Sequence, residues 1–529
     1  MSTLEEESCT GFAYAVRRQL RSLREAAVEW RNNKEIDFSY SKCDPHPFPH
    51  PESDRLEHCY KYGEGKGKFL PVLLNQQLGN YTVKAKLGHG NFASVWQAEP
   101  TTGVSSHGHE SVAVKVCTNS KKDSKDDVAE AKILLKLGKR SDGKGDFGKD
   151  HIIKVDEYFH VPGHFGDHFC IVSEAIGPSL DYYFNLVQKQ GLGAFDYGVA
   201  KKVTFQLLSA TAWLHKAGYA HGDIHPHNIL MKEQGFQAGR NEKRYLEPKN
   251  TKAKDLKYMP PYLVSCIDGD DLGVRAPLTF ENCDARLADF GQTFKKSHPR
   301  RLYKMTTPKG NRSPEWVIKR LPITESIDVW AIACIAYRMT TGKHLMFVEE
   351  RYTDANGKYT QKRTKADINI DHMPMMVGLL GTPPSWLIKR WSSSGLPQLD
   401  WDSVRAEGTL HERIQQDRPA SMSDAEAVLF EDFLRKAFAW DYRHRATAKD
   451  LVQHEWFQSI LTKEDRAAME AMLAHRDSKL KAAFKRGFKK LRFLSARIGA
   501  LGAKKVEFPA EPFVVEKIPV PTIEVLRLD

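Results

Sequence analysis

The ten residues 221–230, HGDIHPHNIL, place the strongest constraint on how this chain can fold. A carboxylate, Asp223, stands five residues before a side-chain amide, Asn228, and a proline restricts the loop between them. The two apolar residues that follow predict a return into a strand. A carboxylate can orient a hydroxyl and accept its proton, while amide and carboxylate oxygens bind magnesium. The spacing is typical of phosphoryl transfer, although an acidic turn before a strand would give the same pattern.

The length and composition indicate a globular chain with more than one part. At 529 residues it exceeds a typical domain, which favours two lobes or domains with appendages. Hydrophobic residues make up 41% and charged residues 28%, so the chain can bury a sizeable core. Lys and Arg number 79 against 67 Asp and Glu, and the formal charge of +12 suits anionic partners such as a nucleotide, a nucleic acid or a phosphorylated protein.

The cysteines and the apolar runs bear on the compartment. Eight cysteines without a C-x-x-C pair favour a reducing environment over a disulfide scaffold. The Cys- and His-containing stretch 43–59 matches no zinc spacing. No apolar run approaches the roughly 18 residues of a membrane span, and the acidic start MSTLEEESC is unlike a signal or transit peptide. We therefore expect the cytoplasm, the nucleus or both.

A glycine-containing turn between two strands is predicted at 81–100, YTVKAKLGHGNFASVWQAEP. Gly88 and Gly90 would let backbone amides approach phosphates closely, whereas the dinucleotide-binding form of such a turn opens a helix instead. The next strand, 112–116, carries Lys115, which could be an ordinary edge residue. Its position after the glycine turn favours a phosphate contact.

Two further acidic residues could complete such a site. Glu130 lies in a predicted helix, 126–137, one turn before an apolar cluster, where it could reach back to Lys115. A solvated helix glutamate is the alternative. Asp289 follows a short predicted strand in ARLADFG and is the natural principal magnesium ligand, with Phe290 buried beneath it.

The remaining segments suggest how the parts connect. Folded structure is predicted to begin near Phe69, and Glu174-Ala175-Ile176-Gly177 to link two lobes after an apolar strand. A helical run, 197–216, leads into residues 221–230, which form the opening loop. The polar and basic insertion at about 232–257 is predicted to be a loop or partly disordered.

In the order of its motifs, the chain resembles the eukaryotic protein kinase family. The matching elements are Gly88/Gly90/Val95, Lys115, Glu130, Asp223/Asn228, Asp289-Phe290-Gly291, Ser313-Pro314-Glu315 and a final segment, 441–457, in which Arg445 would pair with Glu315. Within that family the chain is similar to the SR-protein kinase branch. The stretches that carry this likeness are YGEGKGKFLPVLLNQQLG, SIDVWAIACIAYRMTTG, DHMPMMVGLLGTPP and the insertion before Asp289.

The resemblance implies an α+β, two-lobed fold with a small β-rich lobe and a larger helical lobe. The small lobe would span 69–174 and the large lobe 175–460, the latter with the insertion at about 232–257. Residues 1–68 would comprise an amphipathic helix, 11–31, and a Pro/His-rich connector. Residues 461–529 would form a basic helical extension and an extended tail.

The resemblance also implies catalytic roles. Asp223 would act as the base, Lys115 would hold the phosphates and Glu130 would orient Lys115. His225 stands where protein kinases carry a lysine that touches the transferred phosphate. A neutral imidazole can donate a hydrogen bond there but supplies no fixed charge at pH 7, so we expect slowed or altered catalysis.

ATP and Mg²⁺ are the ligands that the resemblance implies. Asn228 and Asp289 would bind the magnesium ion, and backbone groups at Glu174 and Ile176 would bind the adenine edge. Three apolar side chains would enclose the adenine: Val95, Ala113 and Leu230. The turn that would cover the phosphates consists of Leu87, Gly88, His89, Gly90, Asn91, Phe92, Ala93, Ser94 and Val95.

Two further departures from the family pattern affect regulation and the peptide substrate. Gly222 replaces the arginine of the usual His-Arg-Asp, so we expect no activation-loop phosphorylation switch of the usual kind. Pro308 lies where Ser/Thr kinases carry a threonine that bonds to the base. These changes leave two alternatives to a protein Ser/Thr kinase: a weakly catalytic pseudokinase or scaffold, and a small-molecule phosphotransferase of the aminoglycoside and choline type, whose loop also resembles HGDxHPxN. The latter enzymes lack the Ser313-Pro314-Glu315 segment and the Arg445 helix, whereas the intact polar residues argue against a scaffold.

The expected partners are ATP and a protein with Ser or Thr hydroxyls. SR-protein kinases bind arginine-rich peptides in acidic grooves, yet the segment 295–304, KKSHPRRLYK, is basic and would disfavour such a peptide. The predicted basic helix 479–497 has one apolar face that could dock on the core, an anionic surface or RNA, or could simply be solvated.

Overall fold

The computed structural model describes residues 62, 65–105, 108–119, 125–140, 147–232, 243–245, 260, 262–267, 269–297, 309–318, 321–346, 351–353, 359–362, 365–393, 399, 401, 408–463 and 466–467. The chain divides into two compact units, Met1–Met469 and Glu470–Asp529, and every described residue belongs to the first. The predicted helices 11–31 and 479–497 lie outside the described residues, as does Pro308.

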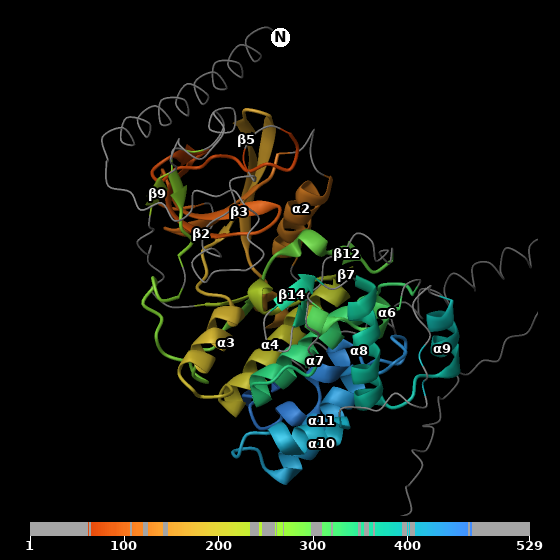
Figure 1. The fold of residues 1–529 in the computed structure, drawn as a ribbon. Helices are drawn as coiled ribbons and strands as arrows, with labels where there is room; N and C mark the ends of the chain where they lie inside the picture. The colour runs from red at the N-terminus through yellow and green to blue at the C-terminus, as the bar shows by residue number, and fades with distance from the viewer. Residues whose placement is uncertain are drawn as a thin grey trace, which may run out of the picture. The chain divides into compact units, whose positions relative to one another are not determined.

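Six antiparallel strands form the sheet of the small lobe, in the order β1-β2-β3-β4-β6-β5 (Figure 1). The strands are β1 (Gln77–Leu78), β2 (Tyr81–His89), β3 (Ala93–Pro100), β4 (Val112–Cys117), β5 (Val155–Gly163) and β6 (Gly166–Glu174). In the first half of β2, buried and partly exposed residues alternate, as expected when one face of a strand covers a core. Strands β4, β5 and β6 contribute to this core valines, whose branched side chains suit a pleated sheet.

One long helix, α2 (Lys125–Lys139), packs against β5 and β6 of this sheet. Its buried residues, Ala131, Leu134 and Leu137, are spaced by three, which places them on one helix face. Glu130 precedes them and is also buried, at 4% exposure. The helix therefore presents a carboxylate, as well as apolar side chains, to the interior.

Two nearly fully buried helices, α4 (Tyr197–Lys216) and α7 (Ser326–Thr341), pack together in the large lobe. α4 begins at the cap Asp196, whose side chain accepts from the N–H groups of Gly198 and Val199. The other helices are α3 (Leu180–Lys189), α6 (Pro314–Val317), α8 (Lys365–Leu380), α9 (Ser385–Ser392), α10 (Leu410–Asp417), α11 (Asp424–Ala437) and α12 (Ala448–Val452). Short 3-10 turns lie at Phe147–His151, Pro226–Asn228, Phe290–Gln292, Lys309–Asn311 and Glu455–Phe457.

Short antiparallel strand pairs position the loops between the lobes. β8 (Ile229–Met231) pairs with β11 (Ala285–Leu287), and β7 (Tyr219–Ala220) pairs with β12 (Phe294–Lys295). Because these pairs flank residues 221–228 and 288–293, they hold the two predicted acidic loops next to each other. A further pair joins β13 (Arg351–Thr353) to β14 (Tyr359–Lys362).

A buried ion pair joins α6 to the segment before α12. Arg445 donates from Nη1 to Glu315 Oε1 at 2.7 Å and from Nη2 to Oε2 at 3.1 Å, and both side chains are at most 1% exposed. The two parallel hydrogen bonds satisfy the planar guanidinium and the carboxylate together. This confirms the predicted Arg445–Glu315 pair.

The insertion after β8, where a loop or partly disordered segment is predicted at about 232–257, contains a short strand, β9 (Lys243–Tyr245), paired with β10 (Tyr262–Val264). The rest of that range after Lys232 lies outside the described residues. Tyr262 and Val264 are buried against the sheet of the small lobe, beside which β9 lies in Figure 1. The polar composition of 232–257 gives no sign of this strand pair, because the apolar residues that anchor it, Tyr262 and Val264, lie after residue 257.

Beyond β10 the insertion passes from one lobe to the other within two residues. The N–H of Ile267 donates to the carbonyl of Lys86 in β2 at 2.8 Å. Gly269 lies against the ring of Tyr182 in α3, where an added Cβ would come within 2.2 Å of the ring. Tyr182 also donates from its hydroxyl to the carbonyl of Val274 at 2.6 Å. The insertion is thus a second connection between the lobes, besides the linker after β6.

Ordered packing also begins earlier than the predicted Phe69. Tyr62 is buried and meets Phe69 edge to face, with ring centroids 6.1 Å apart. The N–H of Gly67 donates to the carbonyl of Asn119 at 3.1 Å, and the N–H of Asn119 donates to that of Lys68 at 2.9 Å. Part of the predicted connector is therefore packed on the small lobe. None of the helices in the described part of the chain combines the length and apolar character that a membrane span needs.

Candidate active site

Lys115 lies at the centre of an ion-pair network between the lobes. Its Nζ is 3.0 Å from both carboxylate oxygens of Glu130 and 2.9 Å from Asp289 Oδ1. Burial alone would lower the pKa of Lys115, but the charges of Asp289 and Glu130 raise it well above its ordinary value. The lysine therefore stays protonated, and the predicted pair with Glu130 is present.

The turn that carries Asp289 has an unusual backbone conformation. Asp289 has a φ of 58°, in the left-handed region that few residues other than glycine adopt. Its Oδ1 accepts from the N–H of Gly291 at 3.3 Å, and the N–H of Phe290 donates to Glu130 Oε1 at 3.1 Å. Phe290 is 1% exposed, as predicted. The charge of Lys115 lowers the pKa of Asp289 to about 2, so this carboxylate is ionised.

The backbone of the opening loop is hydrogen-bonded to the side chain of Asp328 in α7. Asp328 accepts from the N–H groups of His221 and Gly222, each at 2.8 Å, and lies 2.9 Å from His215 Nε2. Burial would raise the pKa of Asp328, but the hydrogen bonds from His215 and from the N–H of Gly222 lower it. Gly222 has a φ of +86°, which its lack of a Cβ permits.

His221 connects Asp223 to the segment before Asp289. Its Nε2 is 3.0 Å from the carbonyl of Ala288, so this nitrogen must carry a proton and donate. Burial lowers the pKa of His221, which keeps the ring neutral. Its Nδ1 then accepts from the N–H of Asp223 at 3.3 Å. The imidazole of His221 thereby links the loop that carries Asp223 to the segment that precedes Asp289.

Asp223, His225 and Asn228 occupy one short loop. Asn228 donates from Nδ2 to the carbonyl of Asp223 at 3.0 Å, and its own N–H donates to the carbonyl of His225 at 2.9 Å. His225 Nε2 lies 3.7 Å from Asp223 Oδ2. Asp223 Oδ1 and His225 Nδ1 are both buried, and neither has a hydrogen-bond partner among the described residues. The loop is rigid in its backbone but leaves two polar atoms unsatisfied.

The predicted nucleotide contacts share one face of the small-lobe sheet. Val95 pairs directly with Lys115, and Ala113 precedes Lys115 by two residues, so all three side chains point to the same side. Leu230 bridges to Ser179, just before α3. The structure thus brings the sheet face, the opening loop and the linker to one junction between the lobes.

The linker and the glycine turn border this junction. In the described part of the chain, neither the N–H nor the carbonyl of Ile176 makes a hydrogen bond, which leaves both for a ligand. In the glycine turn, Gly90 donates to the carbonyl of Ala93 at 2.8 Å, and Phe92 at the tip is 67% exposed. The structure places the turn at the end of β2 and the start of β3.

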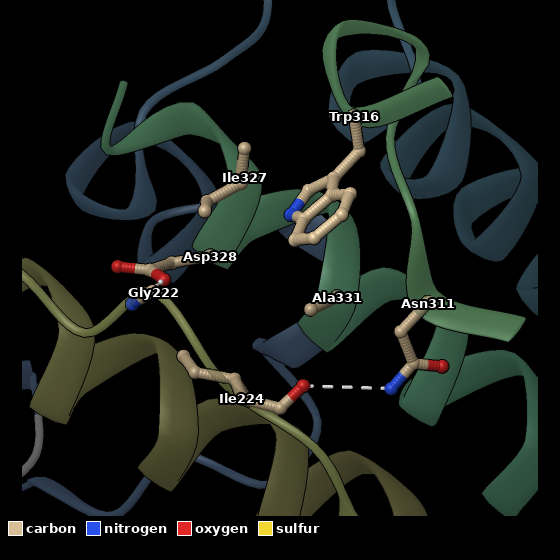
Figure 2. A pocket seen from close by; sticks show the side chains of 7 residues that line it. All are labelled: Gly222, Ile224, Asn311, Trp316, Ile327, Asp328 and Ala331. Atoms are coloured by element: carbon tan, nitrogen blue, oxygen red, sulfur yellow. Dashed lines mark hydrogen bonds between the residues drawn. The ribbon is translucent and has the colours of Figure 1, made fainter. Parts of the chain in front are cut away.

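A separate small cavity lies beneath the opening loop (Figure 2). It measures about 10 Å³ and is lined by Gly222, Ile224, Asn311, Trp316, Ile327, Asp328 and Ala331. Asn311 closes one side by donating from Nδ2 to the carbonyl of Ile224 at 3.4 Å. A space of this size holds about one water molecule, so the cavity cannot be the nucleotide site.

Comparison with known protein families identifies this architecture. The family model described as protein kinase domain matches residues 81–265 and 277–457. The chain belongs to the protein kinase family. A crystal structure of a kinase domain matches this kinase with a TM-score of 0.50 and 19% identity, covering 74% of this chain and 99% of that one. This likeness supports the predicted two-lobed fold.

Curated relatives of this kinase include members of the branch that the sequence resembles. It is 24% identical over 409 residues to serine/threonine-protein kinase AFC3 of Arabidopsis thaliana, covering 74% of this chain and 86% of the relative. It is 25% identical over 426 residues to serine/threonine-protein kinase SRPK of Physarum polycephalum, covering 75% and 90%. Protein kinase dsk1 of Schizosaccharomyces pombe is 32% identical over 168 residues, which cover 31% of this chain and 29% of the relative. The predicted protein kinase family and its SR-protein kinase likeness are confirmed, and the family generally uses ATP and Mg²⁺.

Several residues that organise the site escaped the sequence analysis. His215 is one, because nothing in the helix 197–216 distinguishes it from a surface residue of the last turn, yet it contacts Asp328. Tyr182 is another, because its partners lie in the insertion. Arg338 lies at the end of α7, in a helix that the sequence marks only as buried.

Proposed function

We propose that this kinase transfers the γ-phosphate of ATP to Ser or Thr hydroxyls of proteins. The observation that carries this proposal is the opening loop, in which a buried carboxylate oxygen, Asp223 Oδ1, has no hydrogen-bond partner among the described residues. Because Lys115 and Asp289 meet beside the same loop, a phosphate donor and a hydroxyl acceptor could be held together there.

Asp223 is the proposed base. A substrate hydroxyl would donate to Oδ1, which is otherwise unsatisfied, and Asp223 would accept its proton as the new bond forms. The hydroxyl oxygen then bonds to the γ-phosphorus, the bond from that phosphorus to the bridging oxygen breaks, and ADP leaves with the electron pair. His221 and Asn228 keep the backbone of Asp223 in place during this step.

Lys115, Glu130 and the sheet face are proposed to bind ATP. Lys115 would contact the phosphates while Glu130 keeps its ammonium oriented, as the pair of 3.0 Å contacts allows. The glycine turn, Leu87 to Val95, would cover the phosphates with backbone amides. Val95, Ala113 and Leu230 would enclose the adenine. The free backbone groups of Ile176 and the carbonyl of Glu174, whose N–H already donates to Lys154, would bind its edge.

Asn228 and Asp289 fit the proposed magnesium site. Each has one oxygen, Asn228 Oδ1 and Asp289 Oδ2, that takes no hydrogen bond from the described residues. Asp289 is held ionised by its pKa of about 2, and magnesium prefers such oxygen donors. When bound, the ion would offset negative charge on the phosphates.

The comparisons favour a protein substrate over a small molecule. The serine/threonine-protein kinases AFC3 and SRPK align over 86% and 90% of their own lengths. The Arg445–Glu315 pair, which small-molecule phosphotransferases lack, is formed and buried. Some relatives carry the name dual specificity protein kinase, so transfer to tyrosine is the second activity to test.

The test compares purified wild type with Asp223→Asn, each incubated with magnesium and labelled ATP. The acceptors are Ser, Thr and Tyr peptides, basic proteins and aminoglycosides. We expect label on Ser or Thr with the wild type and loss of label in the variant. Label on aminoglycosides alone would replace the proposal by a small-molecule phosphotransferase. ATP binding without any transfer would replace it by a pseudokinase.

A further inference from the structure

A polar cluster lies beside the opening loop, outside the proposed ATP contacts. His227 in this loop has its Nε2 3.7 Å from Oδ2 of Asp181, which stands in the first turn of α3. The ring of His227 is 5.8 Å from that of His225, the neighbour of the proposed base Asp223. The cluster thus begins next to the place where the substrate hydroxyl would bind.

Arg338 supplies the fixed positive charge of this cluster. It stands in the last turn of α7, and its guanidinium stacks on the ring of Phe184 at 3.8 Å. The side chain is partly buried, and among the described residues its guanidinium has no hydrogen bond or ion pair. This partly buried guanidinium therefore offers up to five N–H donors for which the described residues supply no acceptor.

Arg338 lies near Asp181, because Phe184, on which it stacks, stands three residues after Asp181 on the same face of α3. Burial, followed by the charge of Arg338, lowers the pKa of His344 to about 4 against the opposing charge of Asp181. The His344 ring is therefore neutral at pH 7 and can donate a hydrogen bond. Asp181 accepts from Asn185 Nδ2 at 3.3 Å and lies 3.7 Å from His227 Nε2.

The sequence around the cluster is also positive. Between Gly291 and Ser313 the chain carries seven Lys and Arg residues and no Asp or Glu; these are Lys295, Lys296, Arg300, Arg301, Lys304, Lys309 and Arg312. His344 lies next to the end of this segment, since an added Cβ on Gly310 would be 3.9 Å from its Nδ1. The sequence that leads to Gly310 thus carries a net positive charge, which favours an anionic over a cationic substrate.

We propose that Arg338, together with His227, binds a carboxylate or phosphate on the substrate chain close to the accepting Ser or Thr. This inference rests on the proposed function and names the substrate class: peptides that carry Asp, Glu or an already phosphorylated residue beside the acceptor. A carboxylate or phosphate accepts two parallel hydrogen bonds from a guanidinium, which matches the donors that Arg338 leaves open.

The same geometry disfavours an arginine-rich peptide. A substrate arginine placed here would face Arg338 across a partly buried gap, and like charges repel most strongly where water is excluded. The kinase should therefore disfavour arginine beside the acceptor at this position.

The experiment measures kcat/KM on one Ser peptide series in which each flanking position carries Ala, Asp, phosphoserine or Arg. The full-length wild type is compared with Arg338→Gln, Arg338→Glu and the control Arg390→Glu, an exposed arginine in α9. At one or more positions we expect the wild type to prefer Asp or phosphoserine over Ala by about tenfold or more, as a charge-assisted hydrogen bond allows. The size of the Asp and phosphoserine effects distinguishes a carboxylate-directed from a phosphate-directed site.

The variants separate this role from a structural one. In Arg338→Gln the preference should fall to about twofold or less, and in Arg338→Glu the Arg peptides should become the better substrates, while Arg390→Glu keeps the wild-type order. Each kcat/KM value is divided by that of the Ala peptide with the same variant, so a smaller fraction of folded enzyme does not change the ratio. The melting temperature of each variant measures any loss of stability separately. A wild type that phosphorylates the series without preferring acidic residues, or a preference that survives Arg338→Gln, overturns this inference alone. A wild type that phosphorylates no peptide overturns the proposed function and this inference with it.

Discussion

On the nucleotide side of the junction between the lobes, Lys115 Nζ has three carboxylate oxygens within 3.0 Å. On the hydroxyl side, Asp223 Oδ1 and His225 Nδ1 are buried without a hydrogen-bond partner among the described residues. The first set of charges is mutually satisfied, so its geometry does not depend on a ligand. The second holds unsatisfied polar atoms, each of which costs about 1–3 kcal/mol until a partner is bound.

This difference coincides with the departures from the family pattern. The nucleotide side retains the residues that the family resemblance implies, namely Lys115, Glu130 and Asp289. Gly222 and His225 are on the hydroxyl side, and the cluster of His227, Asp181 and Arg338 adjoins it. The contrast teaches that the changes in this chain concern the acceptor rather than the phosphate donor.

The largest expected effect comes from Asp223→Asn, which removes the proton acceptor on the hydroxyl side. We expect kcat to fall by about a hundredfold or more. ATP should still raise the melting temperature, because the Lys115 network is untouched. Phosphoryl transfer with labelled ATP and thermal unfolding with and without ATP measure the two effects. An equal loss of ATP binding would show that the two sides are not independent.

Lys115→Met tests the nucleotide side and should abolish the shift in melting temperature that ATP produces. It also has a pH signature. The pKa of Asp289 is lowered from 3.8 to about 2 in the folded protein, so its pairing stabilises the fold above about pH 4 and is lost as the pH falls towards 2.

Melting temperatures of wild type and Lys115→Met between pH 2 and pH 7 check this linkage. The difference between the two proteins should be largest near neutral pH and should narrow on acidification. Parallel curves would contradict the ion pair with Asp289. Lys149→Met, at a lysine of the small 3-10 turn Phe147–His151, serves as a control that does not touch the network.

His225→Lys sharpens the contrast by restoring a fixed charge on the hydroxyl side. We expect kcat to rise by about tenfold at most, because an ammonium next to the transferred phosphate stabilises its charge. His225→Gln keeps a hydrogen-bond donor without the charge and should change kcat less. If lysine lowers kcat more than glutamine does, the imidazole itself is required. Initial rates at saturating ATP distinguish these cases.

The smallest effect is expected from Gly222→Ala, which tests whether the backbone of the hydroxyl side is as rigid as its contacts with Asp328 suggest. A φ of +86° is unfavourable for alanine, so the free energy of unfolding should fall by about 1–2 kcal/mol. Gly138→Ala is the matched control, because it lies in α2 with nothing within 4 Å of an added Cβ. That change should be neutral or stabilising in urea titrations. A neutral Gly222→Ala would indicate a loop that can relax.

The site residues that could be predicted are those whose spacing along the chain carries the chemistry. Asp223 and Asn228 are five residues apart, and Asp289 is followed directly by Phe290 and Gly291, a spacing that suits phosphoryl transfer once the companion motifs are present. The Lys115–Glu130 pair was predicted because those neighbouring motifs favour it over a solvated glutamate. The two-lobed α+β fold followed from the resemblance to protein kinases that the order of these motifs carries.

The insertion could not be predicted, since its function in the fold depends on distant partners. Residues 232–257 are polar and gave no sign of a strand, yet β9 pairs with β10, whose Tyr262 and Val264 depend on the small-lobe sheet for burial. Tyr182 likewise looks like any aromatic residue of a helix until Gly269 and Val274 are placed against it.

By itself, the sequence determined the family, the order of the motifs and the residues that pair or act within a few positions of one another, because short-range spacing limits the available geometries. Only the tertiary structure decided which side chains remain unsatisfied. Lys115 and Asp289 are 174 residues apart, and Arg338 meets Phe184 only because α7 and α3 lie together. Such pairings depend on how whole helices and sheets pack, and that packing is the sum of many burial terms that no local pattern contains.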